Sequence, residues 1–404
     1  MADFLTEQQA GELVKQYMAR EKPARSTQAL LRASSVTPWL GNFIVQAGKV
    51  SDSIRGGRGS FKVEEAVWKT DFAPYLSGLN YTFSAPFTVE EKGKLIQKVR
   101  VDYENPPLQT QDGIDLRIMV RTPRISTHDI NRGEIPLKDQ IVAVNHHMML
   151  GLTQEVLGTS QFTIPGLAPT SVVITAENLK SFPIEMVVRA YMAETDTDTS
   201  LYQAWLKGKT TFCDYAIDPR WIPNGKLPFM MDTPSTKSDE HDESVSPEYF
   251  FERGLLTKAQ YAHIRNAALA AFGMVSGFLR PRGVILADTK TEHGINSKGE
   301  IVVQDEVFTM DSSRYWRKED YDNQLARLAR QEIDRLKPDV YSKQFARNLS
   351  KGAEKYTNEE CALIAARYIV GIQHLTGQRF EPDMRPREER VVSGLQTIVE
   401  QLVA

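Results

Sequence analysis

The chain has only two cysteines in 404 residues, Cys213 and Cys361, and neither lies at a spacing typical of metal ligands. A disulfide framework is therefore excluded, and we expect a reducing, cytoplasmic compartment. No apolar run approaches the roughly 20 residues that a membrane-spanning helix needs. The N-terminal segment Met1–Glu7 lacks the basic and apolar regions of a signal peptide. The net charge is only −3, so nothing favours binding to nucleic acid or to a membrane surface.

The composition is that of an ordinary globular protein, with 41% hydrophobic and 25% charged residues. The chain of 404 residues is long enough for two domains. The glycines at Gly56–Gly59 predict a turn, and the pair His146–His147 predicts the start of a helix. Apolar spacing predicts helices over residues 5–20, 256–279, 319–337, 358–376 and 387–403, and strands over residues 95–103, 115–120, 172–175 and 184–188. This order favours an α+β fold over a regular alternating α/β sheet.

The most informative stretch of the chain runs from Gly283 to Arg314. Two short apolar runs, separated by the turn residues Asn296–Gly299, predict a β-hairpin. Alternation along its first strand places Asp288, Lys290 and Glu292 on one face, with Asp305 close to Glu292. Two carboxylates beside cationic side chains suit a magnesium–nucleotide site. The alternative is a surface hairpin whose charges are solvated.

The order of these residues resembles one known family. Leu286–Gly294, read as Leu-Ala-Asp-Thr-Lys-Thr-Glu-His-Gly, is followed by Asp305-Glu306 and then by Asp311-Ser312-Ser313-Arg314. This resembles the phosphoribosylaminoimidazole-succinocarboxamide synthase (SAICAR synthetase) family. Further segments resemble that family in the same order, so that the match covers roughly residues 95–380; they are Lys98–Glu104, Arg121–Asp129, Ile135–Lys138, Phe182–Tyr191, Thr233–Lys237, Glu240–Glu243 and Tyr341–Arg347.

The resemblance implies a two-lobed α+β fold with ATP in the cleft between the lobes, an N-terminal extension and C-terminal helices. We expect the extension over residues 1–90, a smaller nucleotide-binding lobe over residues 91–180 and a larger lobe over residues 181–404. The extension could cap the smaller lobe or form a contact in a homo-oligomer, and the sequence does not decide between the two.

The resemblance also implies a reaction, the joining of L-aspartate to 5-aminoimidazole-4-carboxylate ribotide in purine biosynthesis. ATP is split to ADP and phosphate, because a carboxylate is a poor acyl donor and is first converted to an acyl phosphate. Such a site holds several anions together and needs Mg²⁺ and a cluster of cations. The expected partners are therefore these small molecules, with no nucleic acid and no membrane.

The resemblance assigns residues to the nucleotide side of this site. Glu292 and Asp305 would hold Mg²⁺ and orient the phosphates of ATP. The segment Ala176–Leu179 would lie against the adenine. The expected ATP-binding side chains are Lys98, Arg100, Lys180, Lys237, Glu292 and Asp305. For Arg100 the alternative is a charge on the surface of a strand, because Gln97 replaces a glycine of the family.

The resemblance assigns a second set of residues to the other two substrates, the ribotide and L-aspartate. Lys290 and Asp242 would be catalytic, with Asp242 near the imidazole. For Asp242 the alternative is an acid interacting with a helix dipole, and for Arg314 it is an arginine that caps a turn. The expected substrate-binding residues are Arg124, Ser126, Asp129, Arg189, Ser200, Ser312, Ser313, Arg314, Lys343 and Arg347.

One departure from the family bears on the substrate. The family has a Gly-Ser pair shortly after the residue that corresponds to Tyr191, and its serine helps to bind the sugar phosphate. Here either Glu194-Thr195 replaces that pair, or about five residues are inserted and Ser200 takes the place of the serine, which we favour. New acids beside a phosphate repel it unless they point away or are neutralised. Two rivals follow: the same fold acting on a different carboxylate or amine, and a non-catalytic nucleotide-binding relative.

Overall fold

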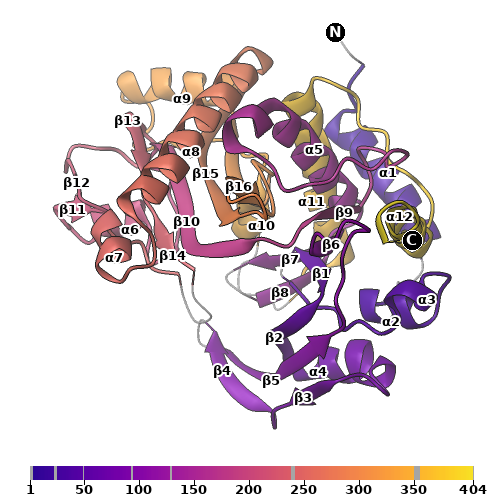
Figure 1. The fold of residues 1–404 in the computed structure, drawn as a ribbon. Helices are drawn as coiled ribbons and strands as arrows, with labels where there is room; N and C mark the ends of the chain where they lie inside the picture. Colours follow the sequence, from indigo (N-terminus) through magenta and orange to yellow (C-terminus); the bar gives the residue numbers. More distant parts are fainter. Residues whose placement is uncertain are drawn as a thin grey trace.

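The computed structural model describes residues 3–21, 25–48, 50–91, 94–127, 130–237, 242–349 and 355–403. Its larger half is built on an antiparallel sheet with the strand order β13-β10-β15-β16, to which β14 adds at β10 and β17 adds at β15 (Figure 1). The strands are β10 (Lys180–Tyr191), β13 (Lys226–Asp232), β14 (Ser235–Thr236), β15 (Val284–Ile295), β16 (Ile301–Gln304) and β17 (Ser313–Arg317).

Helices cover this sheet in successive layers: α8 packs on β10 and β15, α5 packs on α8, α11 on α5 and α1 on α11. These helices are α1 (Glu7–Arg20), α5 (Lys138–Leu157), α8 (Lys258–Leu279) and α11 (Asn358–Thr376). Apolar residues three or four apart give α8 its buried face, as Ile264, Ala268 and Phe272 illustrate. One hydrophobic cluster therefore joins the sheet to all four helices.

Three of these helices begin at the same local signal. Thr6, Thr257 and Thr357 each accept a hydrogen bond from the backbone N–H three residues on, and the Gln or Glu side chain at that third position accepts one in return from the threonine N–H. Such a capping box satisfies two N–H groups that a helix start leaves without partners. The sequence Thr-x-x-Gln/Glu thus sets where α1, α8 and α11 start.

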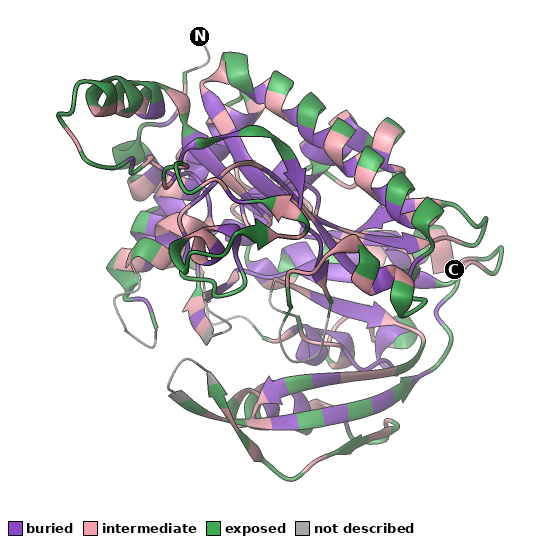
Figure 2. Ribbon diagram, turned by 90° about the vertical axis from the view of Figure 1, so that its left-hand side faces the viewer, coloured by how far each residue is buried: buried purple, intermediate pink, exposed green. Residues whose placement is uncertain are grey.

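The smaller half contains two sheets, with strand orders β1-β6-β9 and β2-β5-β3, and β4 pairs with β5. Along β5 the residues Val99, Val101 and Tyr103 are buried, whereas Arg100 between them is exposed. This alternation is visible along the strands at the bottom of Figure 2. The strands are β1 (Ser51–Arg55), β2 (Gly57–Glu64), β3 (Tyr81–Phe83), β4 (Phe87–Glu91), β5 (Lys94–Asn105), β6 (Leu116–Arg121) and β9 (Val173–Glu177).

The core of the smaller half is shared by both ends of the chain. Its hydrophobic cluster includes residues from α2, α3 and η1, together with residues of the C-terminal α12 and η4. These elements are α2 (Thr27–Arg32), α3 (Thr37–Leu40), η1 (Trp68–Phe72), α12 (Arg387–Ile398) and η4 (Val399–Val403). Strands β1 and β2, from the expected extension over residues 1–90, pair with β6 and β5 of the expected smaller lobe. The C-terminal helix α12 likewise belongs to this half and not to the larger one.

The remaining elements are distributed over both halves (Figure 1). They are α4 (Glu65–Val67), η2 (Ala73–Tyr75), β7 (Arg124–Thr127), β8 (Ile130–Glu134), α6 (Leu201–Leu206), β11 (Thr211–Phe212), β12 (Tyr215–Ala216), α7 (Pro247–Glu252), η3 (Arg280–Arg282), α9 (Lys318–Ala329) and α10 (Lys343–Leu349). Mixed helix and strand in this arrangement confirm the expected α+β class.

Three local predictions differ from the structure. The chain bends at Gly56 and has a φ of 77° at Gly57, but residues 57–59 already belong to strand β2. A Cβ at Gly59 would lie 2.3 Å from the ring of Tyr103, so glycine there permits close strand pairing. The helix expected over residues 319–337 ends at Ala329, where the chain turns through a left-handed Gln331. His146 lies inside α5 and does not begin it.

Among the described residues, no helix combines the length and the apolar character that crossing a bilayer requires. The longest described helix, α8, exposes Lys258, His263 and Asn266 together with alanine, glycine and methionine residues.

One buried side chain ties the first 60 residues to β5. The amide of Asn105 accepts a hydrogen bond from the N–H of Ile44 at 2.7 Å and donates to the carbonyls of Ile44 and Arg55, each at 2.9 Å. We expect Asn105→Ala to lower the free energy of unfolding by about 2–4 kcal/mol, because three hydrogen bonds are lost and their backbone partners stay buried. Urea unfolding measures this, with the exposed Asn80→Ala as control. Equal midpoints for both variants would contradict it.

Candidate active site

Strand β15 carries three charged side chains on one face, at Asp288, Lys290 and Glu292. The Nζ atom of Lys290 lies 3.1 Å from a carboxylate oxygen of Glu292. Asp288 and Lys290 line the same pocket. The hairpin with β16 and the shared face are thus confirmed, and they follow from simple strand alternation.

Glu292 lies between two lysines. Lys290 contacts one of its oxygens and Lys237, from the loop after β14, contacts the other. Burial alone would raise the pKa of Glu292, but the two ammonium groups outweigh it and hold that pKa below its usual range. The carboxylate is therefore ionised near neutral pH, and it fixes the positions of two cations.

Lys290 has a second acidic partner, Glu185 on the neighbouring strand β10. Burial raises the pKa of Glu185, and Lys290 opposes that rise. Burial would lower the pKa of Lys290, yet Glu292 and Glu185 raise it. Lys290 is therefore a fixed positive charge and not a proton acceptor in this state. Asp242 is exposed, and its charge is close enough to raise the pKa of Glu185.

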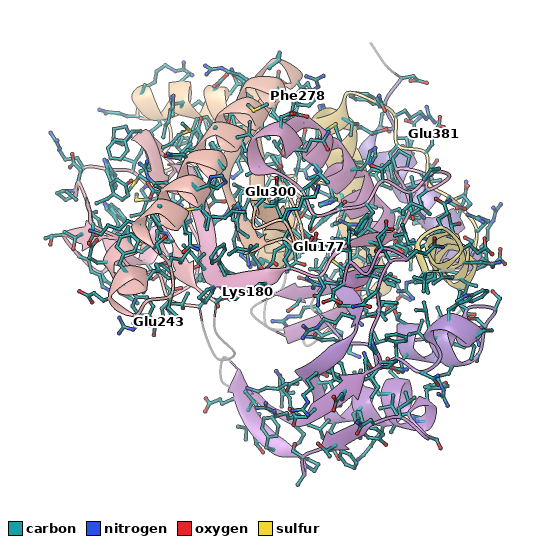
Figure 3. The ribbon with its side chains drawn as sticks, in the orientation of Figure 1. Glu177, Lys180, Glu243, Phe278, Glu300 and Glu381 are labelled. Carbon is teal, nitrogen blue, oxygen red and sulfur yellow. The ribbon has the colours of Figure 1, made fainter. Side chains whose placement is uncertain are left out.

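A pocket of about 260 Å³, which we call the Asp305 pocket, lies where the two halves meet. Its wall includes the connection between β9 and β10, whose ends Glu177 and Lys180 are labelled in Figure 3. The lining residues are Gln46, Arg55, Arg117, Met119, Ser160, Ala176, Glu177, Asn178, Leu179, Ser181, Lys237, Gln304 and Asp305. The structure thus brings together three expected parts of an ATP site: the segment Ala176–Leu179, Lys237 and Asp305.

Asp305 follows Gln304, the partner of Glu292 across the hairpin. Its backbone has a φ of 58°, a left-handed conformation that ends the strand. The carboxylate pairs with Arg117 at 2.7 Å, and both side chains remain about a quarter exposed. Asp305 thus keeps an anionic group at the wall of the pocket.

The acids present suit a metal ion that arrives with its nucleotide. In the described part of the chain, no group of three His, Cys, Asp or Glu residues could hold a metal ion. Mg²⁺ is commonly bound through one or two carboxylates together with substrate phosphates and water. Glu292 and Asp305 fit that donor set, and they do not fit a resident metal held by protein alone.

A second pocket, of about 240 Å³, is rich in cations, and we call it the Arg314 pocket. Five of its residues carry positive charge and two carry carboxylates. The lining residues are Val187, Arg189, Thr197, Asp288, Thr289, Lys290, Asp311, Ser312, Ser313, Arg314, Ser342, Lys343, Gln344 and Arg347. Seven of the residues expected from the sequence to act on substrate meet here: Arg189, Lys290, Ser312, Ser313, Arg314, Lys343 and Arg347.

Asp288 forms ion pairs with two arginines of this pocket, Arg189 and Arg314, and so fixes their positions. One of its oxygens lies 3.0 Å from Nη1 of Arg189 and the other 3.2 Å from Nε of Arg314. Arg189 also donates to Thr233 at 2.9 Å, and Arg314 donates to the carbonyl of Ala193 at 3.3 Å. Each guanidinium group has further N–H groups, so both can still bind an incoming anion.

Asp311 anchors the loop that leads to Ser312 and Arg314. It forms a fully buried ion pair with Lys138 of α5 at 2.6 Å and accepts a hydrogen bond from the hydroxyl of Tyr368 at 2.8 Å. Burial would raise the pKa of Asp311, but Lys138 and Lys343 lower it. A buried ion pair of this kind is costly to break, because one charge would remain without a partner.

Lys343 is the cation whose charge changes most easily. Burial, together with Arg347 and Lys138, lowers its pKa to about 8, although Asp311 opposes the change. Burial also lowers the pKa of Arg189 and of Arg347. The pocket is thus poised to gain an anion, which would offset the desolvation of these cations.

Three of the serines expected to bind substrate, Ser200, Ser312 and Ser313, make different hydrogen bonds. Ser312 accepts a hydrogen bond from the N–H of Thr309 at 3.1 Å. Ser313 is buried and lies 2.7 Å from the hydroxyl of Thr289. Ser200 is buried too and does not line the pocket: its hydroxyl caps helix α6 by accepting from the N–H of Gln203 at 3.2 Å. Thr197 lines the pocket in its place.

Several expected residues lie outside the linings of both pockets. Lys98 and Arg100 alternate along β5 with the buried Val99 and Val101, and Arg100 pairs with Asp102 at 3.1 Å. Lys180 is exposed at the start of β10, beside the lining residue Ser181 (Figure 3).

Arg124 and Ser126, both expected to bind substrate, lie two residues apart on β7 and outside the linings of both pockets. Arg124 pairs with Asp52 and donates to the carbonyl of Gly48 at 2.8 Å. Ser126 is buried in β7. Asp129 lies outside the described residues.

Several charged residues without an expected role take part in the site, and they include Glu185, Lys138 and Arg117. Glu185 could have been found from its spacing, because it lies four residues before Arg189 on one strand and so shares its face. Lys138 and Arg117 come from a helix and a strand far from their partners in sequence. No local pattern predicts such pairs.

Comparison with known proteins gives a consistent result. The profile that describes the SAICAR synthetase family matches residues 98–362. A phosphoribosylaminoimidazole-succinocarboxamide synthase from the chloroplast of Arabidopsis thaliana is 31% identical over 291 residues, which are 69% of this chain and 68% of that protein. A putative synthase of the same name from Mesorhizobium japonicum is 32% identical over 313 residues, 75% of this chain and 94% of the relative.

A solved structure shares the fold. The SAICAR synthase from Saccharomyces cerevisiae, complexed with SAICAR, superposes with a TM-score of 0.58 over 84% of this chain and 97% of its own, at 20% identity.

The pKa of Lys343 predicts how substrate binding depends on pH. Because this lysine is charged below about pH 8 and neutral above it, kcat/KM for a phosphorylated substrate should fall as the pH rises through about 8. Lys343→Arg keeps the charge and should remove that fall. Lys343→Met should lower kcat/KM roughly tenfold or more at pH 7, through loss of a charged hydrogen bond. A wild-type profile that stays flat to pH 9.5 would count against the assignment.

Proposed function

The chain belongs to the SAICAR synthetase family, and we propose that its Asp305 and Arg314 pockets together carry out that family's reaction. The reaction joins L-aspartate to 5-aminoimidazole-4-carboxylate ribotide with cleavage of ATP, and it makes the protein a ligase of purine biosynthesis. The observation that carries the proposal is the position of Glu292, which contacts Lys237 of one pocket and Lys290 of the other.

In this proposal the Asp305 pocket binds ATP. The backbone of Ala176–Leu179 reads the adenine edge, and Lys237 contacts the phosphates. Glu292 and Asp305 complete the ligand set of Mg²⁺ when it arrives with the nucleotide. The bound metal supplies charge neutralisation at the phosphates. Lys98, Arg100 and Lys180, which lie outside the lining of this pocket, are proposed to bind ATP from its edge.

The Arg314 pocket binds the phosphate of the ribotide. Arg189, Arg314 and Arg347 present planar guanidinium groups, which suit phosphate because each can bind two oxygens. Lys343 adds a charge, and Ser312 adds a hydroxyl. Asp288 and Asp311 hold these cations in place. The ribotide then extends from its phosphate towards Lys290 and Glu292, with Asp242 near the imidazole.

The chemistry takes place where the pockets meet. The carboxylate of the ribotide receives the terminal phosphoryl group of ATP, and the amine of aspartate then displaces phosphate from the acyl phosphate. Lys290 and Lys237 face the anions that approach each other there, so they reduce the repulsion between them. Arg124, Ser126 and Asp129 are proposed to contact aspartate. The free cysteines Cys213 and Cys361 accord with a proposed cytoplasmic location.

The function is tested by ADP release with ATP, Mg²⁺, L-aspartate and the imidazole carboxylate ribotide, with each omitted in turn. We expect ADP only when all four are present, because phosphoryl transfer needs the acceptor and the product forms only with the amine. Turnover that persists without the ribotide but requires another acid would show a different acceptor. Tight binding of Mg–ATP without any turnover would show a non-catalytic relative.

The division into two pockets makes a crossed prediction. Arg314→Ala should weaken binding of the ribotide by about 1.5–3 kcal/mol, the cost of a lost charged hydrogen bond, with little effect on ATP. Lys237→Met should weaken binding of ATP more than that of the ribotide. Arg317→Ala on the same strand β17 is the control, since Arg317 is half exposed and pairs with Glu319. Equal effects of Arg314→Ala on both ligands would place it elsewhere.

A further inference from the structure

The smaller half of the molecule contributes two arginines to the Asp305 pocket, Arg55 and Arg117. They come from β1 and β6 of the sheet β1-β6-β9, whereas the third cation of the lining, Lys237, follows β14 in the larger half (Figure 1). Lys98 and Arg100, the cations expected at the phosphates of ATP, lie outside this lining. The positive charge at the wall of the pocket is therefore supplied by other residues than the sequence predicted.

Arg55 and Arg117 are directly opposite each other in the sheet. Arg55 is the register partner of Arg117, which in turn is the partner of Ala176 on β9. All three residues line the pocket, so this row of the sheet faces it. Like charges at opposed positions of an antiparallel pair, with Cβ atoms about 5 Å apart, destabilise the sheet. An anion bound between the two side chains would offset that repulsion, so the pair favours an anion-binding role for this wall.

Arg117 is held in position by two contacts. Its Nε atom donates to the hydroxyl of Ser53 at 2.8 Å, and its Nη1 atom lies 2.7 Å from Oδ1 of Asp305. The guanidinium group has further N–H donors beyond these two, and the carboxylate has further acceptor positions. Arg117 and a metal ion can therefore share Asp305, and the ion pair need not break when a nucleotide binds.

Arg55 lacks such a balancing acid. It is half-buried, and in the part of the chain that the structure describes it forms no ion pair with a carboxylate. Burial raises the pKa of Tyr103, and the charges of Arg55 and Arg117 oppose that rise, so both act on this one side chain. The hydroxyl of Tyr103 donates to Gln46, another lining residue, at 3.3 Å. Two guanidinium groups thus converge in one part of the pocket, and only one of them is neutralised.

We propose that Arg55 and Arg117 bind the phosphates of ATP. The inference rests on the proposed function, because it takes the Asp305 pocket as the nucleotide site and Asp305 as a ligand of Mg²⁺. Since Arg117 contacts Asp305, its guanidinium group lies beside the phosphates that the same metal ion would contact. Arg55 on the neighbouring strand adds the charge that has no acidic partner. Each planar guanidinium group can bind two phosphate oxygens.

The proposal makes opposite predictions for stability and for binding at Arg55. Arg55→Met removes the repulsion from Arg117 and breaks no ion pair with an acid, so the protein without ligand should unfold at a higher urea concentration. The same change should raise the Kd for ATP about tenfold or more, because a charged hydrogen bond is lost. An arginine with a purely structural role would behave in the reverse way. A lower urea midpoint together with an unchanged Kd would therefore overturn the proposal.

The binding test compares ATP with adenosine, which lacks the phosphates. Both are titrated calorimetrically in the presence of Mg²⁺ and in the absence of the other substrates. Arg55→Met and Arg117→Met should each raise the Kd for ATP about tenfold or more and leave the Kd for adenosine within about twofold. Because Arg117→Met also removes the partner of Asp305, Arg117→Lys, which keeps the charge, should recover part of the affinity. The control is Arg58→Met, which should match the wild type, since Arg58 is 85% exposed and pairs with Glu104.

The other outcomes separate this inference from the proposed function. Equal losses for ATP and adenosine would place the arginines at the base or the ribose and would overturn the phosphate assignment. An unchanged Kd for ATP in Arg55→Met or Arg117→Met, with the wild type active in the ADP-release assay, would also overturn it and leave the proposed function standing. A wild-type protein that binds neither ATP nor adenosine would overturn both.

Discussion

The site depends on one constraint: every charge on the inner face of β15 must have a partner of opposite sign. Asp288 lies between Arg189 and Arg314, Lys290 between Glu185 and Glu292, and Glu292 between Lys290 and Lys237. These groups are mostly buried, and an unpaired buried charge is far more costly than a paired one. The ladder of ion pairs along β15 therefore exists only when β10, β17 and the loop after β14 are all in register. Folding of the sheet and assembly of the site are one event.

The same constraint explains why acids are interleaved with the cations of the Arg314 pocket. Five cationic side chains around a pocket of about 240 Å³ repel one another when no anion is bound. Asp288 and Asp311 reduce that repulsion from within the wall, and Lys138 and Tyr368 fix Asp311 in turn. The Arg314 pocket thus keeps its positive charge, and ion pairs hold its guanidinium N–H groups in fixed orientations before an anion binds. Preorganised charges of this kind need no rearrangement when the anion binds.

Much of this could be predicted from the sequence because it is local. Alternation placed Asp288, Lys290 and Glu292 on one face, and the family resemblance placed Arg189, Arg314, Lys343 and Arg347 among the substrate-binding residues, which together line one pocket. What could not be predicted was the pairing between distant elements, such as Arg117 with Asp305 or Lys138 with Asp311. The family resemblance assigned Ser200 to a serine that binds phosphate, and the structure places its hydroxyl as the N-cap of α6. The pairing of β2 with β5, which joins residues on the two sides of the boundary expected at residue 90, is likewise marked by no change in composition.

The junction at Glu292 shows why two anionic substrates can meet in this cleft. A bare carboxylate there would repel both the phosphates of ATP and the carboxylate of the ribotide. With Lys237 and Lys290 in contact, the three groups together carry a net positive charge, and each lysine faces one pocket. Glu292 thus acts as a tether that keeps two cations near each other, which two lysines alone would resist. Replacing it with a neutral residue would remove the tether and one proposed metal ligand at once. Replacing Lys237 or Lys290 one at a time instead changes the positive charge of a single pocket and leaves the proposed metal ligand in place, since each lysine lines one pocket only.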